Sequence, residues 1–109
     1  MFPSRLQKEQ LDFLCDAISV VGTREQAYRV LSDLCTIAEV ESMSQRLVVA
    51  RLLRTGATYQ QIVKETGASS ATISRVKRCL ENGAGGYETI LAALDERNDT
   101  SMHQEREER

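Results

Sequence analysis

The chain has 109 residues, of which 41% are hydrophobic and 5% aromatic, with no tryptophan. This length allows one domain and excludes two domains of ordinary size. A domain this small exposes a large surface for its volume, and a core built without bulky rings is thin. We therefore expect a homodimer in which two chains share one core.

The net charge of −2 conceals a strong segregation of charge along the chain. Residues 1–45 carry four basic and seven acidic side chains, and residues 79–109 carry three basic and eight acidic ones. Residues 46–78 carry seven basic side chains against Glu65 alone, a balance of +6. Electrostatic binding to DNA requires such a local concentration, although solvated helix faces would also produce it.

The sequence gives no sign of secretion, a membrane span or catalysis. The first ten residues lack the apolar core of a signal peptide, and no apolar run approaches the ~20 residues that a span needs. Cys15, Cys35 and Cys79 are widely spaced and odd in number, so we expect reduced, partly buried thiols in a cytoplasmic protein. No Cys/His/carboxylate grouping has metal-ligand spacing, and His103 lies in the charged tail. We expect neither a cofactor nor an enzyme.

Apolar residues recur at helical spacing, and no segment alternates as a strand does. The first helix is predicted from about Ser4 to Val21 and ends at Gly22. Thr23 is the predicted cap of a second helix, with Gln26 at capping-box spacing.

Two further helices are predicted on either side of the segment that carries the function. One begins near Ser42, with Gln45 at capping-box spacing, and ends at Gly56. The other follows the flexible stretch 82–86 and is amphipathic. From residue 95 the chain is charged and almost free of large apolar groups, so residues 95–109 are predicted to form a disordered tail or a frayed helical extension.

Residues 58–78 have the pattern of a helix-turn-helix. Thr58 and Gln61 have capping-box spacing at the start of a short helix, and Gly67 stands where the turn needs a left-handed residue. The Ser69-Ser70 pair then provides the cap of a second helix. The positions predicted to be buried are Ile62, Val63, Thr66, Ala68, Ile73 and Val76.

The opposite face of this second helix carries small polar side chains and arginines, without an acidic residue. Hydroxyl and guanidinium groups contact base edges and phosphates in the major groove, and a helix amino terminus favours phosphate. The face consists of Ser69, Ser70, Ala71, Thr72, Ser74, Arg75 and Arg78. A helical hairpin with a polar exterior would share this face, but the turn glycine, the two caps and the buried pattern together favour DNA binding.

The stretch LLRTGATYQQIVKETGASSATISR, Leu52 to Arg75, resembles the reading head (the DNA-contacting helix-turn-helix) of the Trp repressor. Residues 1–94 are similar to that superfamily and form the predicted domain, before the tail at 95–109. The stretches SMSQRLVVARLL (42–53) and ENGAGGY (81–87) resemble its YerC/YecD-type branch. The resemblance implies an all-α fold of about six helices, an intertwined homodimer, and paired reading heads on a palindromic DNA operator.

The resemblance also implies, by matching position, which side chains face DNA. These are Gln60, Ser69, Ser70, Ala71, Thr72 and Ser74. With the exposed cations and the first cap included, the predicted DNA-binding residues are Thr58, Gln60, Lys64, Ser69, Ser70, Ala71, Thr72, Ser74, Arg75, Lys77 and Arg78.

The chain departs from the Trp repressor pattern at the corepressor site. There, the indole of the corepressor lies between two arginines, beside a glycine that follows the second. Arg75 matches the second arginine, but Gln45 stands at the first and Val76 at the glycine. Losing one stacking arginine removes a contact worth on the order of 1 kcal/mol, and a valine fills space that the ligand needs, at typically ~1–3 kcal/mol. We hypothesise that tryptophan does not bind, so that this altered effector pocket holds a different effector or none.

The favoured prediction is a bacterial, sequence-specific regulator of transcription, by the family's default a repressor. One alternative is a helical adaptor whose hairpin docks on another protein, which an exposed apolar patch on the second hairpin helix would favour. Another is sequence-independent DNA binding, which rests mainly on phosphate contacts and counterion release.

Overall fold

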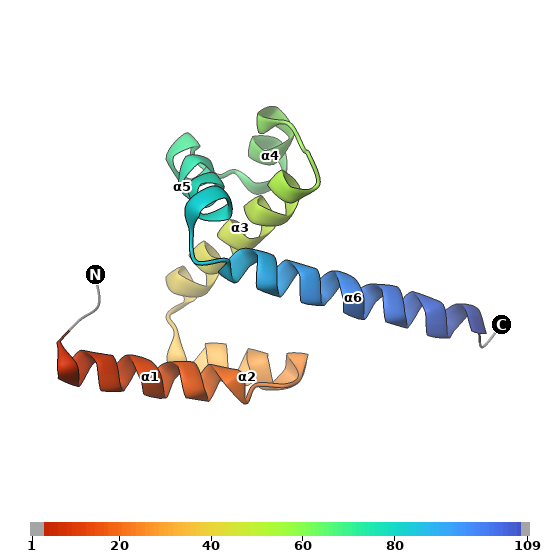
Figure 1. Cartoon of the computed structure of the whole chain (residues 1–109). Helices are drawn as coiled ribbons and strands as arrows, with labels where there is room; N and C mark the ends of the chain where they lie inside the picture. The colour runs from red at the N-terminus through yellow and green to blue at the C-terminus, as the bar shows by residue number, and fades with distance from the viewer. Residues whose placement is uncertain (1–3, 108–109) are drawn as a thin grey trace. The chain divides into compact units, whose positions relative to one another are not determined.

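A computed structural model describes the backbone of residues 4–107 and the side chains of residues 4–99 except Leu6. Over these residues the fold is all-α with six helices, which confirms the predicted fold class (Figure 1). The helices are α1 (Arg5–Ser19), α2 (Arg24–Leu34), α3 (Ile37–Arg54), α4 (Tyr59–Thr66), α5 (Ser70–Asn82) and α6 (Gly86–Glu107). None of these helices combines the length and apolar character needed to cross a membrane. The chain divides into an amino-terminal unit up to Val40 and a carboxy-terminal unit from Glu41.

Polar caps begin both helices of the amino-terminal unit. The Ser4 hydroxyl accepts the Gln7 N–H, and the Gln7 Oε1 accepts the Ser4 N–H at 3.0 Å, which completes a capping box. Thr23 caps α2 as predicted, since its hydroxyl accepts the Gln26 N–H at 3.1 Å. The predicted box is incomplete, however, because the Gln26 Oε1 accepts the Gly22 N–H, one residue before the cap.

The apolar faces of α1 and α2 remain uncovered. No side chain described in either helix is buried. Phe13 is 76% exposed, Val20, just after α1, 78%, and Tyr28 69%. Two short amphipathic helices present too little apolar surface to each other to form a core. This unit therefore exposes an apolar surface of the kind that marks interaction sites.

α3 begins at Ile37, five residues before the start predicted near Ser42. The Thr36 hydroxyl accepts the Glu39 N–H at 3.1 Å, and the Glu39 carboxylate accepts the Thr36 N–H at 2.8 Å. This pair forms the actual capping box, and a carboxylate there also favours the positive end of the helix dipole. The prediction based on Ser42 and Gln45 was wrong, and the Gln45 side chain makes a different contact.

The carboxy-terminal unit contains the hydrophobic core. Its buried residues are Val49, Ala50, Ile62, Ala68, Ile73, Val76 and Leu91, from α3, α4, the following turn, α5 and α6. Four of the six predicted core positions of the helix-turn-helix are therefore buried, and Thr66 is partly buried. Val63 is 37% exposed, contrary to the prediction. Val63 follows Ile62 directly and therefore lies about 100° from it around the axis of α4. Thr66, four residues after Ile62, lies on the same side of the helix as Ile62.

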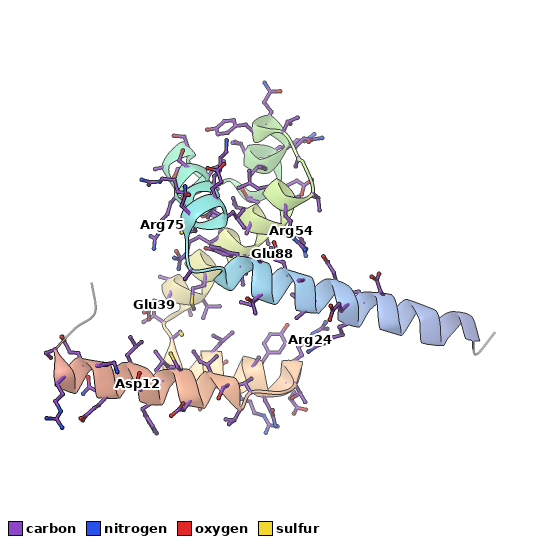
Figure 2. The ribbon with its side chains drawn as sticks, in the orientation of Figure 1. Asp12, Arg24, Glu39, Arg54, Arg75 and Glu88 are labelled. Atoms are coloured by element: carbon purple, nitrogen blue, oxygen red, sulfur yellow. The ribbon has the colours of Figure 1, made fainter. Side chains whose placement is uncertain are left out.

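Arg54, at the end of α3, links that helix to α6 (Figure 2). Its guanidinium donates to both Glu88 carboxylate oxygens, at 3.0 and 3.1 Å, and pairs with Asp95 as well. The hydrogen bonds to Asp95 and Glu88 raise the pKa of Arg54. α6 continues to Glu107 and therefore includes most of residues 95–109, the segment predicted to form a tail. The last two residues of that segment lie outside the described part of the chain. The domain boundary at Leu94 stays a prediction.

The three cysteines are free thiols. Cys35 is partly buried as predicted, but Cys15 and Cys79 are exposed. Cys15 belongs to the uncovered face of α1, so the expected burial fails for the same reason as that of its apolar neighbours.

Candidate nucleic-acid interface

Local hydrogen bonds build the helix-turn-helix from α4 and α5. The Thr58 hydroxyl accepts the Gln61 N–H, and the Gln61 Oε1 accepts the Thr58 N–H at 2.8 Å, which completes the predicted capping box. Gly67 ends α4 with φ at +67°, and its N–H donates to the Val63 carbonyl at 2.8 Å. Ser69, the first of the two candidate serines, is the cap of α5.

The hydroxyls at the start of α5 are held in place by each other. The Ser69 hydroxyl accepts the Thr72 N–H at 3.1 Å and donates to the Thr72 hydroxyl at 3.0 Å. Thr72 is partly buried, whereas the other predicted DNA-facing residues of this helix are exposed. Those exposed residues are Ser70, Ala71, Ser74, Arg75, Lys77 and Arg78. The predicted face is thus exposed except at Thr72, and the hydroxyls of Ser69 and Thr72 are oriented by their hydrogen bond.

The charges around this surface are positive and largely unpaired. The first turns of α4 and α5 contain no acidic residue, so their amino termini remain open to anions. Among the side chains that the structure describes, four cations of this segment have no salt bridge: Lys64, Arg75, Lys77 and Arg78. Arg54, by contrast, is neutralised by Glu88 and Asp95, so it contributes less to a DNA footprint than the sequence count suggests.

The predicted residues at the start of α4, Thr58 and Gln60, are both exposed. Tyr59 lies between them and is 53% exposed. Sequence reasoning did not include this ring in the site. Its place directly after the helix cap Thr58, between two residues predicted to face DNA, is the signal that could have found it.

The three positions of the altered effector pocket have different surroundings. Val76 is completely buried in the core. The Gln45 side chain donates from Nε2 to the Thr66 carbonyl at 3.0 Å, and Arg75 is exposed. The two residues that depart from the Trp repressor pattern are therefore both engaged within the fold.

A separate open pocket of about 400 Å³ lies among α3, α5 and α6. Its lining is mostly apolar and includes Met43, Leu47, Cys79, Tyr87 and Ile90. Sequence reasoning did not find it, because it forms only where α3 packs beside α5, α6 and the turn between them.

Comparisons with known proteins agree with this architecture. The Trp repressor protein family model matches residues 9–95. The YerC protein of Bacillus subtilis (strain 168) is 51% identical over 92 residues, which cover 84% of this chain and 88% of YerC. Two solved structures are similar, and each match covers 85% of this chain and 96% of the solved chain. They are a candidate Trp repressor from Staphylococcus aureus (45% identity, TM-score 0.75) and a TrpR-like protein from Eubacterium eligens ATCC 27750 (41% identity, TM-score 0.77). The chain therefore belongs to the Trp repressor protein family.

Proposed function

We propose that this protein is a sequence-specific regulator of transcription, by the family's default a repressor. It binds double-stranded DNA as a homodimer in the cytoplasm, with α5 in the major groove. The observation that carries the proposal is the exposed face of α5, where hydroxyls and unpaired cations share a surface without carboxylates. A recognition helix of this type places its amino-terminal residues on base edges.

The side chains of α4 and α5 that are predicted to face DNA divide into two roles by their chemistry. Ser70, Ser74 and Arg75 have groups that hydrogen-bond base edges, and Thr72 adds a methyl group beside its oriented hydroxyl. Lys64, Lys77 and Arg78, together with the amino termini of α4 and α5, supply positive charge for phosphates. The first group gives sequence preference, and the second gives affinity that falls with salt.

The exposed apolar surface of the amino-terminal unit supports the homodimer. Large apolar side chains that are more than half exposed there include Phe13, Ile18, Tyr28 and Leu34. A chain this short gains most by covering such a surface with a second copy. A two-fold dimer would present two copies of α5 to a palindromic site.

The adaptor alternative receives less support. Exposed large apolar side chains include Tyr59 and Val63 on α4, whereas α5, which lies entirely within the described residues, has none in the exposed class. A protein-docking helix normally offers such groups as anchors. Sequence-independent binding remains the second candidate, and competition with unrelated DNA at rising salt distinguishes it from operator recognition.

Tryptophan is not the effector in this proposal. Val76 fills its position in the core and Gln45 is engaged with Thr66, so neither offers what an indole would need. Titration of tryptophan into the protein should give no saturable heat in a calorimeter. Tight, saturable binding by the wild-type protein would refute this part of the proposal.

Selection of bound duplexes from a random pool at near-physiological salt tests the function. Wild-type protein should enrich a palindromic motif with half-sites about one helical turn apart. Arg75→Ala should lose the motif, whereas Arg5→Ala should retain it, because Arg5 is an exposed cation of α1 that pairs with Glu9. No enrichment by the wild-type protein, or equal enrichment by Arg75→Ala, would contradict recognition through α5.

A further inference from the structure

One polar contact joins the helix-turn-helix to the scaffold helix α3. The Gln45 Nε2 on α3 donates to the Thr66 backbone carbonyl at 3.0 Å, in a partly buried position. The two residues are 21 positions apart, whereas the other side-chain hydrogen bonds of residues 58–72 join residues at most four apart. Gln45 thus supplies a long-range constraint that the local bonds of the turn do not.

Thr66 carries this constraint into the turn. Its hydroxyl donates to the Ile62 carbonyl at 2.7 Å and accepts the Ala68 N–H at 3.1 Å. Ala68 is buried and directly precedes Ser69, the cap of α5. The Gln45 amide therefore binds the last residue of α4, Thr66, whose own hydroxyl is bonded to the residue just before the cap of α5.

The hydrogen bond also satisfies a carbonyl that the helix itself leaves free. The last carbonyls of a helix have no partner within it. If a partly buried carbonyl of this kind loses its partner, the folded state is destabilised. Gly67 gives the turn its left-handed conformation, but a glycine alone does not restrict the direction in which α5 leaves α4. A side-chain donor from a third helix provides that restriction.

We propose that Gln45 is a positioning residue that holds the reading head in its DNA-binding arrangement, so that operator binding needs no small-molecule effector. This inference rests on the proposed DNA-binding function, but its structural half can be measured without DNA. A donor contributed by the chain itself is always present. The fraction of protein with its reading head in the DNA-binding arrangement then depends on this contact and on the core, not on the concentration of a ligand.

Hydrogen exchange of the backbone amides tests the structural half. Gln45→Met keeps the length of the side chain but removes the donor, and Gln45→Lys restores a donor. Exchange at Gly67 and Ala68 should be about fivefold faster in Gln45→Met, as expected for the loss of one hydrogen bond, and should return toward wild type in Gln45→Lys. Gln10→Met, at an exposed amide of α1, should leave this exchange unchanged. Unchanged exchange in Gln45→Met would overturn the proposal, whatever the DNA results.

Binding of the selected duplex, without added small molecules, tests the functional half. Gln45→Met should bind it about fivefold more weakly than wild type, with unchanged affinity for an unrelated duplex. Gln45→Lys should recover the ratio of the affinity for the selected duplex to the affinity for the unrelated duplex. Its added charge raises both affinities and therefore largely cancels from this ratio. Faster exchange with an unchanged ratio would overturn the positioning role, and so would wild-type binding that requires an added ligand. If wild-type protein bound no DNA at all, the proposed function would fail, while the exchange experiment would still decide whether Gln45 holds the turn.

Discussion

The substitution Val76→Ala measures how completely the reading head fills its own core. Val76 has no exposed surface and packs in the cluster that includes Val49 and Ile62. Removing two buried methyl groups forfeits ~0.8 kcal/mol for each, and the cavity left behind adds roughly 1 kcal/mol. Alanine returns ~0.5 kcal/mol through its higher helix propensity. The free energy of unfolding should therefore fall by about 2 kcal/mol.

Val63→Ala is the matched control, because it removes the same atoms from a helix at a site that is 37% exposed. The propensity gain is the same at both sites, so the two variants differ by burial and cavity alone, and Val63→Ala should lose about 0.5 kcal/mol or less. Urea unfolding at one fixed protein concentration makes the comparison, because dissociation of the proposed dimer would contribute to the apparent stability. Equal losses in the two variants would refute the conclusion that Val76 is fully packed in the core.

Three further outcomes follow from the contacts described above. Lys77→Ala should weaken binding to all duplexes alike and reduce the slope of log affinity against log salt by about one, and a sequence-dependent loss would place this side chain on bases instead. Thr72→Val should change the selected base preference without unfolding the protein, because the Ser69 hydroxyl still caps the same backbone N–H; circular dichroism and a repeated selection check both halves. The Thr36 hydrogen bonds lower the pKa of Glu39 below its ordinary value of 4.5, so this carboxylate contributes stability at neutral pH that is lost as the pH falls below 4.5. Glu39→Gln should therefore be less stable than wild type at neutral pH, and that difference should shrink in acid unfolding scans.

Features that depend on neighbouring residues were predictable from the sequence. The Thr58 capping box and the Gly67 turn each rest on three or four consecutive positions, and both were confirmed. The same local rule also explains the one displaced helix start. Thr36 and Glu39 satisfy the capping pattern as well as Ser42 and Gln45 do, and a charged partner at the helix amino terminus favours the earlier start.

Contacts between distant residues were beyond such rules. The Gln45 contact with Thr66 spans 21 positions, and the pairing of Arg54 with Glu88 spans 34. Neither pair has a spacing that a helix or turn would signal, because each depends on how separate helices pack. The exposed apolar stripes of α1 and α2 follow the predicted periodicity, but periodicity alone does not say what covers a stripe.

In the proposed mode of binding, two reading heads in one homodimer recognise a two-fold symmetric site through α5. The affinity for the selected duplex should be measured against a duplex with about five base pairs, roughly half a helical turn, inserted between the half-sites. Analytical ultracentrifugation should give the number of chains bound to each duplex. Two chains should bind the selected duplex, and the affinity for the duplex with the insertion should be at least tenfold lower, a difference of about 1.4 kcal/mol. Equal affinity for the two duplexes, or one chain bound to each, would contradict this mode of binding.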